Sequence, residues 1–226
     1  MILMNKNKYW LITGLISSIL FVILVSVICL NQSWIIDLDS QFQRLPTMTV
    51  TTIKNQFFSI ITFFGSPIVN ICLTCLIALG VWFRQNQLLN VIWIISAQVI
   101  GDMLVFLFKE IIRRPRPNNQ VMKDTGFSFP SGHTFSTAIV VLIILFIVIP
   151  WLEDQEIQFA ISLLSICWLG VVAFSRLYLR NHFLTDVLGS ILLALAWWEI
   201  MRGIYFTLYN PALESIKLKH LKERKK

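Results

Sequence analysis

Long apolar runs without a charge are the feature that most restricts how this chain can fold. From Trp10 to Leu30 the sequence holds 21 residues with no charged side chain. A helix of this length, at ~1.5 Å per residue, extends about 31 Å and can cross a hydrocarbon core of about 30 Å. Lys6 and Lys8 precede the run as in a secretory signal, but the run is longer than a signal core and no small-residue cleavage site follows it. We therefore expect a retained first span.

Five further apolar runs follow, at residues 57–83, 88–108, 134–152, 157–175 and 187–209. Backbone groups inside a bilayer must be hydrogen-bonded within the protein, which selects helices over an open sheet, and runs this long lack the alternation of a barrel. Only 14% of the residues are charged, against about a quarter in soluble proteins. The sequence predicts an all-α fold: an integral membrane bundle of six transmembrane helices, forming a single domain over residues 1–226. Within the second run, Gly65-Ser66-Pro67 is expected to kink the helix or to mark its boundary.

The basic residues at the two ends of the chain indicate its orientation. Six of the 19 basic residues lie in the tail at 217–226, and Lys6 and Lys8 mark the other terminus. Such charges favour the cytoplasmic surface with its anionic lipids, although a solvated, partly disordered tail is an equal alternative. Both termini are therefore predicted to be cytoplasmic in the cell membrane, which requires an even number of spans.

One loop conflicts with this orientation. With both termini inside, the loop at 109–133 lies outside yet holds five basic residues, whereas the inside loop at 153–156 is acidic. The positive-inside rule alone is ambiguous here. We assign the basic residues of the 109–133 loop to phosphate binding and follow the termini, so an active site in this loop is expected at the extracytoplasmic face.

All four cysteines fall in predicted spans. Cys72 and Cys75 have the spacing of metal ligands, but no further Cys or His stands near them to complete a tetrahedral site. Small apolar helix positions are the better interpretation. We expect no metal, no cofactor, no disulfide framework and no nucleic-acid partner, and the sequence leaves the oligomeric state open.

Three short segments carry polar residues suited to chemistry. They place three cations, two histidines and one carboxylate in an otherwise apolar chain, which suits holding a phosphate, attacking its phosphorus through an imidazole nitrogen and protonating the leaving oxygen. The segments are Lys109-x6-Arg116-Pro117, Pro130-Ser131-Gly132-His133 and Ser175-Arg176-x5-His182-x3-Asp186.

His182 and Asp186 are four residues apart, so on a helical turn they share a face and can hydrogen-bond. A carboxylate on one ring nitrogen fixes the imidazole tautomer and leaves the other nitrogen free to attack. The plainer alternative is a capping aspartate at the start of the sixth span and a snorkelling Arg176.

Ser131 is expected near the N-cap of the fourth span, where free backbone N–H groups attract an anion and Gly132 lets the backbone approach phosphate closely. A membrane-entry cap with an interfacial His133 is the alternative. Lys109 and Arg116 flank a proline-stiffened loop and could surround one phosphoryl group together with Arg176, or serve lipid head groups instead.

These segments resemble the type-2 phosphatidic acid phosphatase superfamily, and within it the bacterial membrane lipid phosphatases of the phosphatidylglycerophosphatase B and undecaprenyl-diphosphatase kind. The resemblance covers residues 100–190 strongly and the whole chain in its six-span plan. It implies that His182 is the nucleophile of a phosphohistidine intermediate, that Asp186 orients it, and that His133 protonates the leaving group and later helps a water to hydrolyse the intermediate, without a metal. It further implies phosphate binding by Lys109, Arg116, Ser131, Gly132 and Arg176.

Arg180 departs from the family pattern, since many relatives carry glycine two residues before the nucleophilic histidine. The extra cation could contact a second phosphate or nearby lipid head groups.

A phosphotransferase with the same phosphohistidine and a non-enzymatic carrier of anionic lipids are the competing functions. Vanadium haloperoxidases share the motif but are soluble. Phosphatidylglycerol phosphate, phosphatidic acid and undecaprenyl diphosphate all remain candidate substrates for this lipid phosphatase.

Three ionisable residues lie in the predicted spans outside these segments. Asp102, Glu199 and Arg202 are costly in lipid and are expected to face protein or water. Glu199 and Arg202 are three residues apart and could pair. Asp102 could neutralise a basic partner or lie near a water path.

Overall fold

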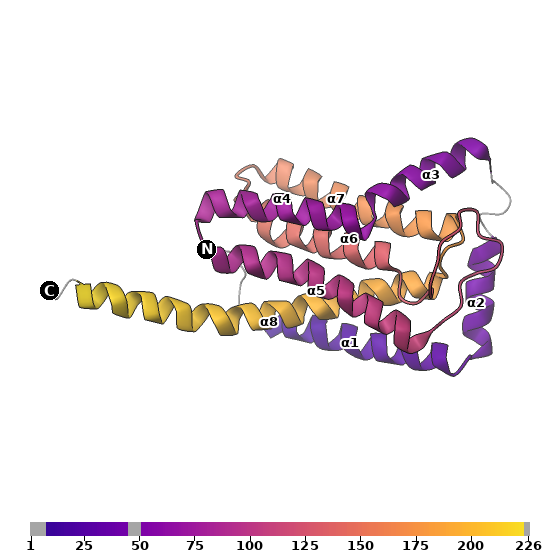
Figure 1. Cartoon of the computed structure of the whole chain (residues 1–226), viewed down its shortest axis with the longest axis horizontal. Coiled ribbons are helices and arrows are strands. Elements are labelled where there is room, and N and C mark those ends of the chain that lie inside the picture. Colours follow the sequence, from indigo (N-terminus) through magenta and orange to yellow (C-terminus); the bar gives the residue numbers. More distant parts are fainter. Residues whose placement is uncertain (1–7, 45–50, 224–226) are drawn as a thin grey trace.

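The computed structural model describes residues 8–44 and 51–223, and this part of the chain is helical with no strand. Six helices of membrane-spanning length run side by side. One shorter helix crosses an end of this bundle, and another projects obliquely outward at the same end (Figure 1). The elements are α1 (Lys8–Cys29), α2 (Ser33–Arg44), α3 (Thr52–Phe64), α4 (Pro67–Gln85), α5 (Leu88–Ile112), α6 (Gly132–Ile143), η2 (Ile144–Val148), η3 (Ile149–Trp151), α7 (Gln155–Tyr178) and α8 (Leu184–Glu223).

The predicted six-span membrane fold is confirmed. Six helices are long and apolar enough to cross a bilayer, and they follow the order expected from the sequence. The spans are Tyr9–Cys29, Pro67–Gln85, Leu88–Ile112, Gly132–Trp151, Gln155–Tyr178 and Leu184–Thr207.

The second predicted span, residues 57–83, is wrong at its start. Gly65 ends α3, and α4 begins anew at Pro67. The Ser66 side chain accepts a hydrogen bond from the Val69 N–H and so caps α4, while Pro67 occupies the first turn, where its missing N–H costs nothing. The Gly65-Ser66-Pro67 segment is thus a boundary between two helices rather than a kink within one.

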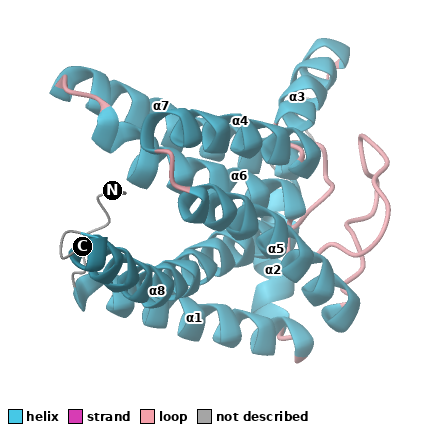
Figure 2. Cartoon of the chain, turned by 60° about the vertical axis from the view of Figure 1, so that its left-hand side comes forward, coloured by secondary structure: helices cyan, strands magenta, loops and turns pink. Residues whose placement is uncertain are grey.

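Helix α6 forms the centre of the bundle. It packs against α4, α5, α7 and α8, and 67% of its span is buried inside the protein, against 22% for α1 and 17% for α7 (Figure 2). At η2 the helix widens to a π-turn just before Pro150. Proline has no N–H to donate, and its ring crowds the carbonyl four residues earlier, so it disturbs the regular α-helical hydrogen bonds there. The fourth apolar run is therefore a core helix, whereas α1 and α7 turn most of their surface to lipid.

The polar ends of four helices meet at one end of the bundle. The last turns of α5 and α7 and the first turns of α6 and α8 lie there, beside the 113–131 loop and the crossing helix α2 (Figure 1). Helix α2 was not expected from the sequence, because its 12 residues mix polar and apolar side chains and form no long apolar run. Helix α1 begins and α8 ends at the opposite end of the bundle.

The buried ionisable residues of the spans face protein, as expected. Glu199 and Arg202 form an ion pair at 2.7 Å, which confirms their predicted pairing. Asp102 accepts hydrogen bonds from Gln98 (2.9 Å) and Ser136 (3.1 Å), so its partners are neutral donors and not the basic residue that the sequence left open.

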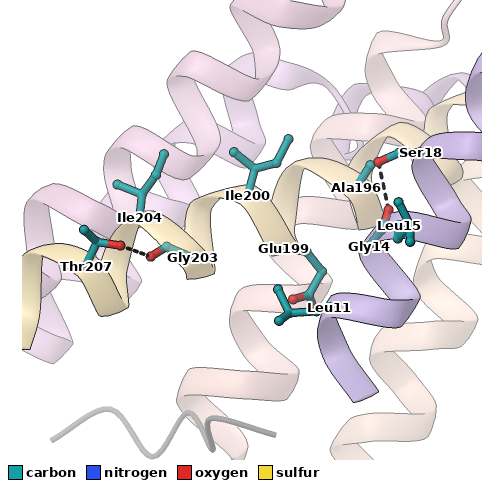
Figure 3. A pocket seen from close by; sticks show the side chains of 10 residues that line it. All are labelled: Leu11, Gly14, Leu15, Ser18, Ala196, Glu199, Ile200, Gly203, Ile204 and Thr207. Carbon is teal, nitrogen blue, oxygen red and sulfur yellow. Dashed lines mark hydrogen bonds between the residues drawn. The ribbon is translucent and has the colours of Figure 1, made fainter. Parts of the chain in front are cut away.

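Glu199 also lines a mainly apolar groove of about 580 Å³ between α1 and α8 (Figure 3). Gly14 permits this close packing, since a Cβ there would lie 2.6 Å from the Glu199 Cβ. The groove lies among the membrane spans and holds none of the residues of the three motifs.

Candidate active site

Lys109, Arg116 and Arg176, hereafter the cation cluster, meet at the polar end of the bundle. Lys109 lies in the last turn of α5 and Arg176 in the last turn of α7, while Arg116 lies in the loop that follows α5. The Lys109 Nζ donates to the Phe127 carbonyl at 2.6 Å. Helix C-termini favour cations, which explains the position of two of these side chains.

Arg176 is the most buried member of the cation cluster. Its side chain is fully buried, and its Nε and Nη1 atoms have no hydrogen-bond partner among residues 8–44 and 51–223. Buried guanidinium donors are rarely left unpaired, because their desolvation is costly. Arg176 therefore presents two free donors in a site that suits an anion.

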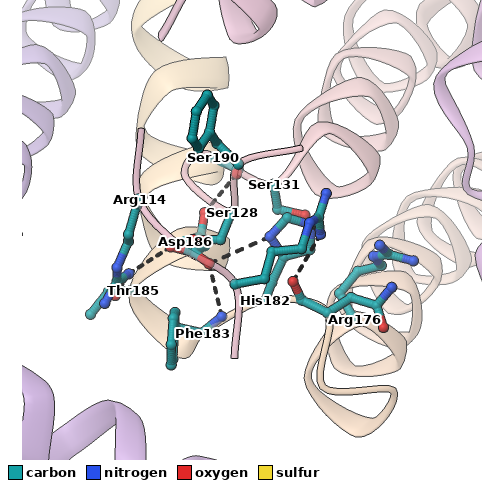
Figure 4. Close-up of polar contacts among 12 residues, drawn as sticks. Arg114, Ser128, Ser131, Arg176, His182, Phe183, Thr185, Asp186 and Ser190 are labelled. Carbon is teal, nitrogen blue, oxygen red and sulfur yellow. Dashed lines mark hydrogen bonds and ion pairs between the residues drawn. The ribbon is translucent and has the colours of Figure 1, made fainter. Parts of the chain in front are cut away.

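His182 lies in the short turn between α7 and α8, and not on the helix itself as its spacing from Asp186 predicted. Asp186 does occupy the first turn of α8. The two side chains still approach one another, with His182 Nδ1 3.4 Å from Asp186 Oδ2 (Figure 4). This distance is longer than an ordinary hydrogen bond but within the range of an electrostatic contact between the ring and the carboxylate.

The other ring nitrogen of His182 faces the cation cluster. Arg116 Nη1 lies 3.2 Å from His182 Nε2. A guanidinium can only donate, so Nε2 must be the acceptor and carry a lone pair, which places the ring proton on Nδ1 facing Asp186. Burial, together with the charges of the cation cluster, holds the pKa of His182 well below its ordinary value of 6.5. The imidazole is thus neutral, with the nitrogen suited to attack directed at the cations.

Asp186 is fully buried and has partners on both oxygens. Its Oδ2 accepts from the Phe183 N–H at 2.8 Å, and its Oδ1 accepts from Arg114 Nη1 at 2.6 Å (Figure 4). The Arg114 guanidinium also stacks on the Phe183 ring, 4.3 Å from its centroid. These contacts keep the carboxylate fixed beside His182.

Helix α2 supports this carboxylate through Asp39, a residue that the sequence analysis did not identify. Asp39 Oδ2 lies 2.6 Å from Arg114 Nη2, so Arg114 bridges two buried carboxylates. Asp39 also accepts from the Thr185 N–H at 3.1 Å and from the Thr185 hydroxyl at 2.8 Å. The α2 residue Gln43 donates to the His182 carbonyl at 2.9 Å. The sequence holds no motif around Asp39 that would have marked it.

The first turn of α6 completes the site. Ser131 is the N-cap, as predicted, and its hydroxyl accepts from the Thr134 N–H. His133 is the second residue of α6, half-buried, within electrostatic range of Arg176 and His182. A Cβ at Gly132 would meet no protein atom closer than 3.9 Å, so packing alone does not require glycine there. The structure thus brings all eight predicted catalytic and phosphate-binding residues to one end of the bundle.

Arg180 adopts a left-handed backbone conformation, with φ of 53°. This region favours glycine, so a residue with a Cβ is conformationally disfavoured at this position. The Arg180 Nη1 reaches the Asn119 carbonyl at 3.5 Å, at the long limit of a hydrogen bond.

A carboxylate that the sequence analysis did not consider, Asp124, stands among the cations. Its Oδ2 lies 2.5 Å from Arg176 Nη2 and 3.1 Å from Arg116 Nη1. Burial raises the pKa of Asp124, but the two guanidinium groups outweigh burial and lower it to about 2. Asp124 is therefore ionised under ordinary conditions.

The scan of family models matches residues 88–209, more than half of the chain, to the PAP2 superfamily. The chain belongs to this superfamily. Phosphatidylglycerophosphatase B of Bacillus subtilis (strain 168) is 30% identical over 155 residues, which cover 66% of this chain and 74% of that protein. The glucose-6-phosphatase catalytic subunit 1 of Felis catus is 28% identical over 164 residues, which cover 59% of this chain and only 44% of the relative.

Two solved structures share the fold. The crystal structure of a transmembrane PAP2-type phosphatidylglycerolphosphate phosphatase from Bacillus subtilis superimposes with a TM-score of 0.76 at 24% identity, over 85% of this chain and 95% of that chain. Aquifex aeolicus LpxE gives a TM-score of 0.54 at 18% identity, over 72% and 93% of the two chains. The resemblance to type-2 phosphatidic acid phosphatases is confirmed, and with it a multi-pass membrane protein of a phosphatase family.

The link between Asp39 and Arg114 yields a stability prediction. We expect Asp39→Ala to lower the free energy of unfolding in detergent by about 3 kcal/mol, because it leaves a buried guanidinium with one of its two carboxylates and the Thr185 N–H without an acceptor. Denaturant unfolding followed by circular dichroism measures the change. Asp37→Ala, an exposed position on the same helix, is the matched control. Equal stability of the two variants would show that α2 is not held by this ion pair.

The contacts of His182 predict its protonation state. Because its pKa is lowered, the ring loses its proton at a lower pH than a free histidine, so we expect it to be neutral at pH 6 with the proton on Nδ1. Nitrogen-15 NMR of histidine-labelled protein in detergent distinguishes the two neutral tautomers and the charged ring. A His182→Gln sample assigns the signal. A charged ring at pH 6, or a proton on Nε2, would be incompatible with the contact between Arg116 and His182.

Proposed function

We propose that this protein is a membrane phosphatase that hydrolyses a lipid phosphate or diphosphate through a phosphohistidine on His182, without a metal ion. The observation that carries the proposal is the position of His182 Nε2, which faces Arg116 at 3.2 Å while Nδ1 faces Asp186. A neutral imidazole with its lone pair directed at a cluster of cations is arranged to attack a bound phosphate.

The reaction proceeds in two displacements. His182 Nε2 attacks the phosphorus, so that a P–N bond forms while the P–O bond to the lipid breaks, and the leaving oxygen takes a proton from His133. His133 then accepts a proton from a water, whose oxygen attacks the phosphorus and breaks the P–N bond. Asp186 stabilises the positive charge that develops on the His182 ring in both steps.

The cation cluster binds the three non-bridging oxygens of the phosphoryl group. The two unpaired nitrogens of Arg176 supply donors in a buried place, where each charge-assisted hydrogen bond is strong. The first N–H groups of α6, at Gly132 and His133, add donors at a helix N-terminus, and the open space beside Gly132 allows the phosphate to approach. Ser131 fixes this turn by capping it.

The substrate we propose is a lipid, because the site lies at the end of six membrane spans and the relatives include a phosphatidylglycerophosphatase. Phosphatidylglycerol phosphate, phosphatidic acid and undecaprenyl diphosphate all offer a terminal phosphate at the interface. Arg180, whose Nη1 reaches the Asn119 carbonyl at 3.5 Å at an exposed position, is the residue we propose for contact with the second phosphate of a diphosphate.

The catalytic assignment predicts different losses for the two histidines. We expect His182→Ala to reduce phosphate release by at least about 10³-fold because it removes the nucleophile. His133→Ala should slow turnover by about 10²–10⁴-fold and leave a phosphoenzyme that persists, detectable by intact mass after an alkaline quench. The assay uses detergent-solubilised lipid phosphates with a chelator present. His220→Ala, near the far end of α8, is the matched control.

The same assay separates the competing functions. Activity of His182→Ala within tenfold of the unsubstituted protein would refute the phosphohistidine and favour a carrier of anionic lipids. A phosphoenzyme that turns over only when an alcohol acceptor is added, and that passes its phosphoryl group to the acceptor oxygen without release of free phosphate, would identify a phosphotransferase. Dependence on a divalent ion would refute the metal-independent reaction.

We further propose that the site lies at the extracytoplasmic face with both termini cytoplasmic, on the basis of the terminal charges and the even number of spans. Asn118→Cys is exposed in the 113–131 loop and should be labelled by an impermeant maleimide on intact cells. The background replaces the four native cysteines, all of which are exposed. A cysteine at Ser215, on the last part of α8, should react only after lysis. The reverse pattern would invert the orientation.

A further inference from the structure

We propose that Asp124 is an internal anion that occupies the phosphate site of the empty protein, competes with phosphate for the cation cluster, and thereby sets how tightly phosphate is held. The inference rests on the proposed function of the cation cluster as the phosphate site. It assigns a role to a residue that lies outside the three motifs.

Asp124 takes the place of a phosphoryl oxygen. One atom, Oδ2, lies within hydrogen-bond range of three donors: Arg176 Nη2 at 2.5 Å, Arg116 Nη1 at 3.1 Å and Asn181 Nδ2 at 3.3 Å. Two guanidinium groups and an amide converging on a single oxygen form the arrangement expected around a bound phosphate.

The carboxylate and an attacked phosphate cannot both occupy this place. Arg116 Nη1 is 3.1 Å from Asp124 Oδ2 and 3.2 Å from His182 Nε2, so one donor atom touches both the carboxylate and the nucleophile. A phosphorus atom within reach of Nε2 places its oxygens against the same donor. Two anionic groups sharing one donor at such distances repel each other strongly, as in paired carboxylates. Asp124 must therefore withdraw when substrate binds.

A phosphate fits the site better than the carboxylate does. Asp124 uses only Oδ2 on the cations, because its Oδ1 accepts from the Thr125 N–H. The Nε and Nη1 atoms of Arg176 consequently remain unpaired and buried. A phosphoryl group has three non-bridging oxygens and can satisfy donors that the carboxylate leaves free, so substrate can displace Asp124.

The surrounding loop allows this exchange without large movement. Arg116 donates to the carbonyls of Thr125 (2.8 Å) and Gly126 (3.0 Å), which hold the backbone beside Asp124 in place. The Asp124 side chain is 27% exposed whereas that of Arg176 is fully buried, so the carboxylate has a path toward solvent and the guanidinium does not. Rotation of the Asp124 side chain toward solvent would free the donors of the cation cluster for a phosphate.

Competition of this kind aids product release. Phosphate held by the cation cluster in a buried site would dissociate slowly, and a carboxylate that returns to the same donors displaces it. Because the pKa of Asp124 is about 2, the competitor stays charged over the whole working range of pH. The alternative role, in which Asp124 merely positions the two arginines, predicts the opposite effect of its removal on phosphate affinity.

The test is the affinity for inorganic phosphate, measured by isothermal titration of the full-length protein in detergent. We expect Asp124→Asn to bind phosphate at least about tenfold more tightly, the scale of one charged hydrogen bond. Product inhibition by phosphate should strengthen by a similar factor. Asp37→Asn removes the same charge from an exposed position on α2 and should bind as the unsubstituted protein does. Asp124→Ser is a second variant in case the amide retains the contact with Arg176.

The possible outcomes are distinct. Equal or weaker phosphate binding by both Asp124 variants would overturn the inference and leave the proposed function intact, since the site would still bind phosphate. Failure of every form, including the unsubstituted protein, to bind phosphate would overturn the proposed function and the inference together. A matching gain in Asp37→Asn would attribute the effect to net charge and overturn the role of Asp124.

Discussion

The site depends on one buried carboxylate, that of Asp186. With no exposed surface at the end of a membrane bundle, this carboxylate depends on the donors around it, which are Arg114, the Phe183 N–H and, at a longer distance, His182. Arg114 in turn is held by Asp39 from α2. Four chain segments therefore meet through one series of opposite charges, and the position of the His182 ring follows from their packing.

A second set of charges, the cation cluster, lies on the other side of the His182 ring. Removal of several cations from water is costly unless an anion accompanies them. In the empty protein Asp124 and nearby backbone carbonyls supply the compensating oxygens. The two sets differ, because Arg114 and the two carboxylates of the first set are paired with one another, whereas Arg176 in the second set keeps donors without a partner among the described residues.

The sequence predicted the six spans, and the motif residues that it marked lie together at one end of the bundle, for separate reasons. Bilayer thickness sets the length of an apolar run, and the three motifs have spacings tied to helix ends. Helix α2 escaped prediction because a short helix of mixed polarity produces no such run. Asp39 and Asp124 were not predicted as part of the site, because each contacts a partner that is distant in the sequence. Asp39 contacts Arg114, 75 residues away, and Asp124 contacts Arg176, 52 residues away. Ser66 and Pro67 are typical of a helix start, but the apolar residues on both sides of them are equally compatible with one continuous span. The sequence therefore left a kink and a boundary as alternatives at this point.

Helix α6 lies at the centre of the bundle and is surrounded by protein, whereas the outer helices face lipid. Lipid contacts α1, α4 and α7 along most of their surface, so these helices need only be apolar and of suitable length. Helix α6 is packed by protein on nearly every side, so changes in the composition or thickness of the bilayer reach it only through its neighbours. The first turn of α6, which carries His133, is therefore positioned by neighbouring helices, and its geometry should persist while the composition of the membrane around the protein changes.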